Sequence, residues 1–328
     1  VYLAAVEAGL TAATLLEDEP LVFVYSGADW ELVSRDIKTL EDIAEQIPEE
    51  DLVDVQKVWT PVNYGGKYRG PVSLRTALAL SINTCAIQTI MQITPKKVIQ
   101  AVRNLGITTP MSNSFALALG SSDVTLQEMV SAYSTFASGG VKTTPYVITK
   151  ITDKDGRILE QNLPKQEEVL SSQICFVMTN MLKSVVERGS GWHARYLNRP
   201  CAGKTGTTNE GSDVWFVGYT PQLAAGVWIG YDDRSISLGD KVTGGNLACP
   251  IWTKFMKEAL AGKPIVEFSQ PDNIDWALID PQTGLLALSK TPGAYLEAFI
   301  KGTAPKQYSD QFIPDSQRLD LTIEEEGF

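Results

Sequence analysis

The pattern of apolar and polar residues predicts three strands close together in the second half of the chain. The strand-like runs at 200 to 207, 213 to 219 and 223 to 231 are separated by short connections. Short connections favour antiparallel pairing, because parallel strands need a long crossover between them. The segment from Pro250 to Leu260 then returns as an expected helix that can cover this sheet.

Capping residues and apolar periodicity predict three helices before this sheet. Each begins at a residue that caps helices well and ends at a glycine. The start and end signals are Thr94 with Gly106, Thr125 with Gly139, and Ser171 or Ser172 with Gly189. The second start is the most specific, since Thr125 and Glu128 have the spacing of a capping box. We therefore expect a helical subdomain beside an antiparallel sheet, an α+β fold.

Two other regions are expected to lie at the periphery. The runs at 146 to 151 and 157 to 159 flank Asp153-Lys154-Asp155-Gly156, which has the composition of a hairpin turn. Acidic residues concentrate at 40 to 55 and again at 324 to 326, and both segments are expected to be solvated. We interpret the first as an exposed acidic face and not as a metal site.

Length, composition and charge restrict the function. The 328 residues, with 44% hydrophobic and 20% charged residues, fit one large folded domain plus an appendage. The net charge of −11 argues against nucleic-acid binding, which needs clustered lysine and arginine. No run of about 18 apolar residues occurs, so these residues are not expected to span a membrane.

Cysteine and histidine usage argues against metal or cysteine chemistry. Cys85, Cys175, Cys201 and Cys249 are too widely spaced for a zinc framework, and the single His193 cannot complete one. We expect buried thiols, since free cysteine packs as a small apolar residue, although spacing cannot exclude disulfides. His193, the only imidazole available to activate a cysteine, is expected in an exposed loop.

The candidate chemistry lies in two short motifs. Lys204-Thr205-Gly206-Thr207 is followed by Thr208 and the run from Asp213 to Pro221, which reads as an active-site strand beside a buried strand. On an extended chain we expect the lysine and the two threonine hydroxyls to face the same way and to suit a carboxylate. Ser81-Ile82-Asn83 lies between apolar helical stretches at 73 to 80 and 85 to 93.

These motifs, in this order, resemble those of serine-acylating penicillin-binding proteins and class A β-lactamases. The segments at 70 to 84, 203 to 208 and 227 to 231 resemble the bifunctional class A penicillin-binding proteins in particular, and the resemblance covers about residues 1 to 260. It implies a penicillin-binding transpeptidase (β-lactamase-like) fold. It also implies a D,D-transpeptidase that cross-links peptidoglycan stem peptides through a serine acyl-enzyme and binds β-lactams.

The resemblance assigns a role to each motif residue. Ser81 would relay a proton, Asn83 would orient a lysine and the substrate amide, and Lys204 would supply positive charge. The Thr205 and Thr207 hydroxyls would bind the substrate carboxylate, and the Thr207 backbone N–H would form half of an oxyanion hole. The implied site residues are Ser81, Asn83 and Lys204 for catalysis and Thr205, Gly206, Thr207 and Thr208 for substrate binding. No metal and no cofactor are implied.

The main departure from the family is that no serine in this sequence is followed three positions later by lysine. Residues 1 to 11 resemble the continuation of the helix that this Ser-x-x-Lys motif opens, so we expect a truncated transpeptidase domain at 1 to 262. The motif and two upstream strands would precede it, and a C-terminal tail at 263 to 328 would follow. The strand at 223 to 231 would then present an open apolar edge, which favours association.

The implied setting is the extracytoplasmic face of the bacterial inner membrane, periplasmic or outer surface. A membrane anchor and a glycosyltransferase domain are expected upstream, and cell-wall assembly proteins are possible partners. In the tail, the segment at 279 to 287 resembles the strand-turn-strand that follows this domain in class A proteins.

Several alternatives stay open. A D,D-carboxypeptidase or a serine β-lactamase would use the same residues with water as the acceptor. A noncatalytic β-lactam sensor or structural paralogue would lack the nucleophile altogether. Ser81 and Asn83 could simply end and begin helices, and Thr208 could simply form a turn. Tyr64 and Tyr68, in a glycine-rich loop, could border a substrate groove.

Overall fold

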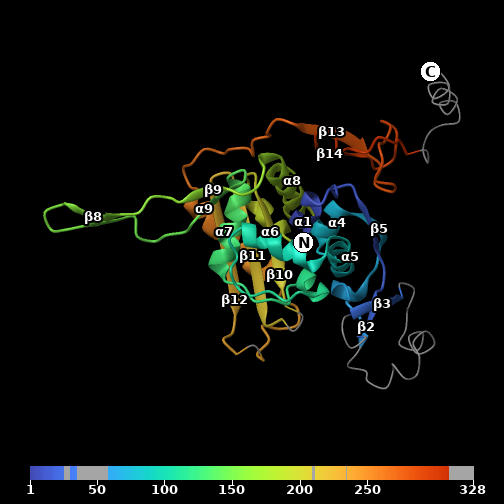
Figure 1. The fold of residues 1–328 in the computed structure, drawn as a ribbon, viewed down its shortest axis with the longest axis horizontal. Coiled ribbons are helices and arrows are strands. Elements are labelled where there is room, and N and C mark those ends of the chain that lie inside the picture. Colours follow the sequence, from blue (N-terminus) through green and yellow to red (C-terminus); the bar gives the residue numbers. More distant parts are fainter. Residues whose placement is uncertain (26–29, 35–57, 209–210, 234, 310–328) are drawn as a thin grey trace.

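The computed structural model describes residues 1–25, 30–34, 58–208, 211–233 and 235–309 (Figure 1). The acidic segments expected to be solvated, at 40 to 55 and 324 to 326, lie outside these residues. The described α-helices are α1 (Tyr2–Glu7), α4 (Leu74–Leu80), α5 (Asn83–Ile93), α6 (Pro95–Asn104), α7 (Leu126–Ala137), α8 (Ser172–Arg188) and α9 (Cys249–Ala259). The described strands are β1 (Leu15–Asp18), β2 (Val22–Tyr25), β3 (Trp30–Ser34), β4 (Val58–Trp59), β5 (Gly70–Ser73), β6 (Val141–Thr143), β7 (Lys150–Thr152), β8 (Ile158–Gln161), β9 (Gln166–Glu168), β10 (Ala202–Thr207), β11 (Asp213–Thr220), β12 (Leu223–Gly230), β13 (Ile274–Ile279) and β14 (Tyr295–Ile300).

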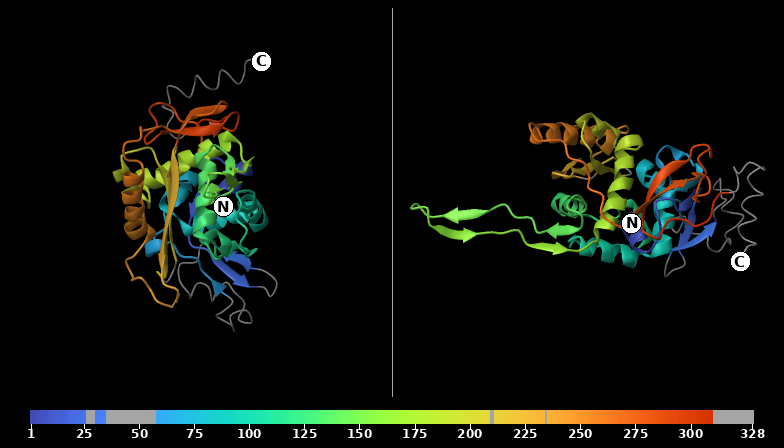
Figure 2. Two further views of the ribbon diagram at one scale, coloured as in Figure 1. Left: turned by 90° about the vertical axis from the view of Figure 1, so that its left-hand side faces the viewer. Right: turned by 90° about the horizontal axis from the view of Figure 1, so that it is seen from above.

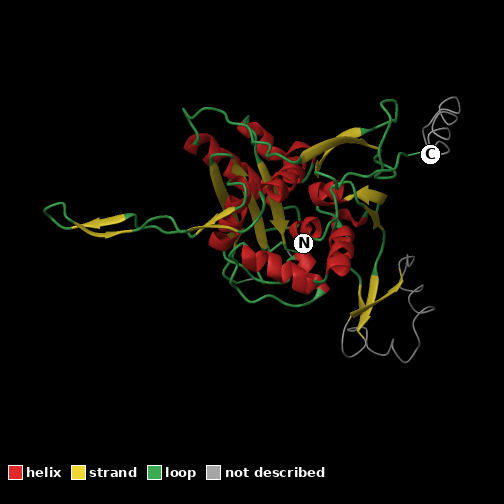
Figure 3. Ribbon diagram, turned by 45° about the horizontal axis from the view of Figure 1, so that its top comes forward, coloured by secondary structure: helices red, strands yellow, loops and turns green. Residues whose placement is uncertain are grey.

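The central sheet has the predicted strands in the predicted arrangement. Its order is β10-β11-β12 and both pairs are antiparallel. Helices α7 and α8 cover one face, where Tyr219 Oη and Thr179 Oγ1 share a 2.8 Å hydrogen bond. Helix α9 covers the other face, where the Trp252 and Phe216 ring centroids are 5.0 Å apart. The layered α+β fold is therefore confirmed (Figure 3).

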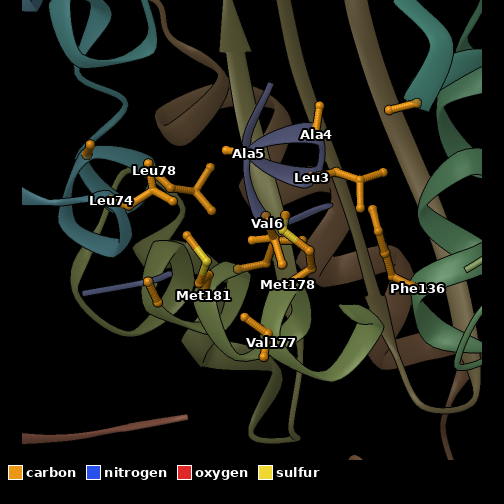
Figure 4. Close-up of a cluster of buried hydrophobic side chains, with 14 of the residues drawn as sticks. Leu3, Ala4, Ala5, Val6, Leu74, Leu78, Phe136, Val177, Met178 and Met181 are labelled. Carbon is orange, nitrogen blue, oxygen red and sulfur yellow. The ribbon is translucent and has the colours of Figure 1, made fainter. Parts of the chain in front are cut away.

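The helices before the central sheet pack around α1, a short helix whose middle residues are buried. Its residues Leu3 to Val6 are at most 7% exposed. They lie among apolar side chains of α4, α7 and α8, including Leu74, Phe136 and Met178 (Figure 4). The core of the domain is thus built around the N-terminal helix, and the helices that pack on it also carry or flank the candidate site.

The predicted helix boundaries agree with the structure because the signals act locally. Thr125 Oγ1 accepts from the Glu128 N–H, and a Glu128 carboxylate oxygen accepts from the Thr125 N–H, which completes the capping box of α7. Of the two candidate serines, Ser171 caps α8, because its hydroxyl accepts from the Ile174 N–H. Helix α6 begins with Pro95 at its first position.

The expected hairpin is present, but its first strand is shorter than predicted. Strand β7 begins only at Lys150, and the segment at 146–149 is not a strand. β7 and β8 project far from the body as an arm, and their residues are exposed (Figures 1 and 2). A two-stranded ribbon without a third strand or a packed face gains little from extending its pairing, so the ladder is short.

The C-terminal part forms a further antiparallel pair, β13–β14, packed beside α8 (Figure 1). The prediction of strand-turn-strand at 279 to 287 was partly wrong. Residue Ile279 ends β13 and makes one isolated bridge to Leu286, whereas the strand that pairs along β13 is β14. The turn itself is present, with Gly284 at φ 69°.

Candidate active site

Two residues 123 positions apart in sequence meet at the centre of the candidate site. The Lys204 Nζ donates a 2.7 Å hydrogen bond to Ser81 Oγ. Ser81 is the C-cap of α4 and adopts the left-handed conformation, with φ 57° and ψ 50°. Residues other than glycine adopt this conformation uncommonly, and such positions cluster at functional sites. Ending α4 in this way places an exposed serine hydroxyl beside the lysine of β10.

The surroundings of Lys204 make its ammonium group easier to deprotonate. The side chain is half-buried, and its Nζ also donates to the Thr205 carbonyl oxygen at 3.0 Å. Burial disfavours the charged form and lowers the pKa of Lys204 to about 8. Near neutral pH the group is therefore a cation that can lose its proton at modest free-energy cost.

The two threonine side chains lie on the other face of β10, so the expectation of one common face was wrong. Thr205 Oγ1 and Ser190 Oγ share a 2.6 Å hydrogen bond, and Thr207 Oγ1 accepts from the Gly244 N–H at 3.0 Å. Successive side chains of a strand point to opposite faces, which separates Lys204 from Thr205 and Thr207. Alternation in fact predicts this separation.

The hydroxyl contacts determine what these threonines can still bind. A hydroxyl has one proton to donate and two lone pairs that accept. Thr207 Oγ1 accepts the Gly244 N–H, which leaves its own proton free for an anion. Thr205 Oγ1 can likewise donate outward when Ser190 Oγ supplies the proton of their shared bond. Both hydroxyls are thus compatible with a bound carboxylate.

Glycine at 206 and 244 allows two segments to approach closely. A Cβ at Gly244 would lie 2.5 Å from the Gly206 carbonyl oxygen and 2.2 Å from that of Trp215. Gly244 opens the π-helical turn η5 (Gly244–Ala248), which Thr243 caps. Neither Gly244 nor Ser190 belongs to the two motifs that the sequence singles out. The Thr243-x-x-Asn246 capping pattern was the signal that could have identified the turn.

Asn83 starts α5 and faces a different partner from the one the motif suggests. Its Nδ2 donates to the Val62 carbonyl oxygen at 2.7 Å. This contact leaves the Asn83 Oδ1 as the atom that can accept from an ammonium or an amide N–H. Asn83 is therefore close to Ser81 in the chain, but its side-chain hydrogen bond to Val62 holds the loop before β5.

That loop is held by a buried carboxylate that no sequence motif identifies. The Asp18 side chain is fully buried, and its Oδ1 accepts from Asn63 Nδ2 at 2.6 Å and from Thr84 Oγ1 at 2.7 Å. Asn63 follows Val62, and Thr84 follows Asn83, so the network holds both partners of the Asn83 contact. These residues are too far apart in sequence for a local pattern to connect them.

Thr208 has the contacts of a turn residue. Its hydroxyl accepts from the Asp213 N–H at 2.9 Å and shares a 3.0 Å hydrogen bond with Ser212 Oγ. These contacts close the connection between β10 and β11. Substrate binding by Thr208 stays a prediction.

The four cysteines are buried and free, as expected. Burial raises the pKa of each thiol to about 12, so none has the thiolate character of a nucleophile. The prediction for His193 was wrong. It is half-buried in the 3₁₀ helix η4 (Trp192–Leu197), and its Nδ1 lies 2.9 Å from the Gly245 carbonyl oxygen.

The described part of the chain offers neither a metal-binding cluster nor a membrane-spanning helix. It contains no group of three or more histidine, cysteine, aspartate and glutamate residues that could hold a metal ion. It also contains no helix with the length and apolar character needed to cross a bilayer.

Comparisons with known proteins show the family to which the chain is similar. Residues 42–256 match the family model of the penicillin binding protein transpeptidase domain. Residues 270–314 match the C-terminal domain of penicillin-binding protein 1A. The second match includes the whole β13–β14 hairpin.

Three individual relatives are each named penicillin-binding protein 1A. Penicillin-binding protein 1A of Pseudomonas aeruginosa is 31% identical over 362 residues, covering 94% of this chain and 41% of that protein. Penicillin-binding protein 1A of Aquifex aeolicus is 38% identical over 247 residues, covering 75% of this chain and 34% of that protein. The crystal structure of penicillin-binding protein 1A from Haemophilus influenzae has a TM-score of 0.79 at 29% identity, covering 94% of this chain and 47% of the other.

The chain therefore spans 34–41% of the length of these two curated relatives. It belongs to the penicillin-binding protein transpeptidase family.

Proposed function

We propose that this chain provides most of the active site of a serine-type D,D-transpeptidase that cross-links peptidoglycan stem peptides. The observation that carries the proposal is the 2.7 Å contact between Lys204 Nζ and Ser81 Oγ. This contact brings the two family motifs together across the boundary between the helical half and the sheet. A cation with lowered pKa next to an exposed hydroxyl can move a proton during acyl transfer.

In this reaction a serine oxygen attacks the carbonyl carbon of the penultimate D-alanine, and the terminal D-alanine leaves as an amine. The attacking serine loses a proton and the leaving amine gains one. Ser81 passes that proton, because its hydroxyl can accept and donate in turn. Lys204 favours the neutral form of a neighbouring base and holds Ser81 in place. Asn83 Oδ1 accepts from that base or from the substrate amide.

The edge of β10 binds the end of the substrate, with Lys204 reaching it from one face and Thr205 and Thr207 from the other. The Thr205 and Thr207 hydroxyls donate to the terminal carboxylate, and the close approach of Gly206 and Gly244 sets the position of Thr207. The Thr207 backbone N–H forms one half of the oxyanion hole. Within the described residues β10 is an edge strand, which leaves room for an extended peptide alongside it.

The attacking serine lies outside these 328 residues in this proposal. None of the serines present is followed by lysine at the third position. Helix α1 is buried beside α5, α6 and α8, and α5 begins two residues after Ser81, so a segment joined to α1 could reach Ser81. We infer a Ser-x-x-Lys motif upstream, a transpeptidase domain at 1 to 262 and a C-terminal unit at 263 to 328. By this inference the 328-residue chain alone forms no acyl-enzyme.

The wider setting follows from the relatives. Because the chain covers less than half of each, a membrane anchor and a glycosyltransferase domain are inferred upstream. Such a protein acts at the extracytoplasmic face of the bacterial inner membrane, on stem peptides and β-lactams, beside cell-wall assembly proteins.

Product analysis tests the proposal and shows whether an amine or water accepts the acyl group. The chain, extended by its native upstream segment, would be incubated with a D-alanyl-D-alanine-ended donor peptide and an amine acceptor. We expect a cross-linked product that disappears in Lys204→Ala. Hydrolysed donor alone would identify a carboxypeptidase. No turnover by the folded protein would favour a sensor or paralogue and contradict the proposal.

A further inference from the structure

A buried ion pair joins the C-terminal hairpin to the helix that ends at Ser81. Arg75 of α4 donates from Nε to Glu297 Oε2 of β14 at 2.6 Å, and its Nη2 donates to Oε1 of the same carboxylate. The side chains are 6% and 0% exposed, respectively. This two-point geometry fixes the guanidinium plane relative to the carboxylate, which a single hydrogen bond does not.

The remaining donors of the same guanidinium hold the third element at this junction. Arg75 Nη1 donates to the Asn180 carbonyl oxygen at 2.7 Å and to Ser184 Oγ at 2.8 Å. Its Nη2 also contacts the Asn180 Oδ1. Both acceptor residues belong to α8. One buried side chain therefore fixes α4, α8 and β14 relative to one another.

Both helices run from this junction directly to the candidate active site. Helix α4 ends at Ser81, six positions after Arg75. Helix α8 ends just before Gly189 and Ser190, and the Ser190 N–H donates to the Ala79 carbonyl oxygen of α4 at 3.1 Å. A Cβ at Gly189 would lie 2.1 Å from that carbonyl oxygen, so the helix ends are in tight contact. Ser190 in turn shares its hydroxyl hydrogen bond with Thr205.

We propose that Glu297 is a positioning residue for acyl transfer. Through Arg75, the C-terminal hairpin sets the ends of α4 and α8 and so places Ser81 against Lys204 and Ser190 against Thr205. This inference rests on the function proposed above. It gives the C-terminal unit a part in positioning the catalytic groups, through Arg75.

Removing the Glu297 charge tests this directly. Glu297→Gln keeps the shape of the side chain but leaves the buried Arg75 without its anionic partner. A misplacement of about 1 Å at reacting groups lowers rates by about 100-fold. The matched control is Glu167→Gln, which removes the 67% exposed carboxylate of the Lys142–Glu167 pair at 2.8 Å; Glu167 lies on β9, which pairs with β6.

Three quantities would be measured on the chain extended by its upstream segment, reacted with benzylpenicillin: the fraction of protein acylated at completion, the rate constant of acylation, and the dependence of that rate constant on pH. We expect Glu297→Gln to reach nearly full acylation with a rate constant lowered about 10- to 100-fold. Its rate should also respond differently to pH, because Ser81 shifts relative to Lys204. Glu167→Gln should match the wild type in all three.

A purely structural role for Glu297 predicts a change in the fraction acylated and not in the rate constant. Glu297→Gln would then lower the fraction acylated, through unfolding, while the folded fraction reacts at the wild-type rate with the wild-type pH profile. That result would overturn the proposal. Failure of the wild type to acylate would instead contradict the proposed function.

Hydrogen exchange on the extended chain gives a second test that does not depend on acylation. We expect Glu297→Gln to speed exchange at the amides of residues 79–83 and 189–191, where the two helices end, and Glu167→Gln to leave these rates unchanged. Unchanged exchange in Glu297→Gln would contradict the inferred path from the hairpin to the site.

Discussion

Replacing Lys204 by methionine should stabilise the folded chain at neutral pH. Methionine has a similar length, but it carries no charge that must be kept out of water. Each pKa unit corresponds to about 1.4 kcal/mol. The fall of the Lys204 pKa from 10.5 to about 8 thus represents about 3 kcal/mol against the charged form in the folded state. Losing the contacts to Ser81 Oγ and Thr205 O offsets about 1 kcal/mol, which leaves a gain of about 2 kcal/mol at pH 7.

The pH dependence has a definite sign. Between pH 8 and 10.5 the unfolded state binds more protons at Lys204 than the folded state, so wild-type stability rises with pH in this window. The advantage of Lys204→Met should therefore shrink by about 2 to 3 kcal/mol between pH 7 and pH 10. Urea unfolding of both proteins at the two pH values measures the difference.

A gap between the two proteins that does not change with pH, or a wild type that is more stable at pH 7, would refute this reasoning. The first result would mean that Lys204 has an ordinary pKa in the folded state. The second would mean that its hydrogen bonds outweigh the penalty of burial.

Three further predictions concern stability and association. Arg75→Met alone should lower the free energy of unfolding by about 3–5 kcal/mol, whereas Arg75→Met with Glu297→Leu should return it to within about 1–2 kcal/mol of the wild type in urea titrations, because no buried charge is then left unpaired. Desolvation raises the pKa of Glu128, but hydrogen bonds from Thr108, Thr125 and Thr109 outweigh it and lower the pKa to about 2. Glu128→Ala should therefore cost about 1–2 kcal/mol at pH 7, and this loss should fade as pH falls from about 4.5 to about 2 in the same assay. Finally, β12 lies at an edge of the sheet within the described residues, so the 328-residue chain should associate in sedimentation experiments; a monodisperse monomer with a cooperative melt would contradict this.

The parts of the fold that the sequence predicted are those with local causes. The capping box of Thr125 and Glu128 and the cap at Ser171 involve atoms three residues apart, so the sequence contains the whole interaction. The three strands of the central sheet follow one another through short turns, which determines their order and direction. The two motifs also predicted which segments meet at the site.

The parts that could not be predicted depend on contacts between distant residues. Arg75 and Glu297 are 222 positions apart, and Asp18 and Asn63 are 45 apart, and neither pair has a recognisable spacing. Burial decides their importance, and burial exists only once the helices have packed. The error at β10 was different, since strand alternation alone separates Lys204 from its threonine neighbours.

The central claim is that Lys204, Ser81 and Asn83 form an acylation site that an upstream serine completes. The most direct test is the intact mass of the extended chain after incubation with benzylpenicillin. We predict a single covalent adduct on the upstream serine, lost or strongly slowed in Lys204→Ala and Asn83→Ala, and no adduct on the 328-residue chain alone. A folded, extended protein that forms no adduct, or one whose adduct is unaffected by both substitutions, would contradict the account.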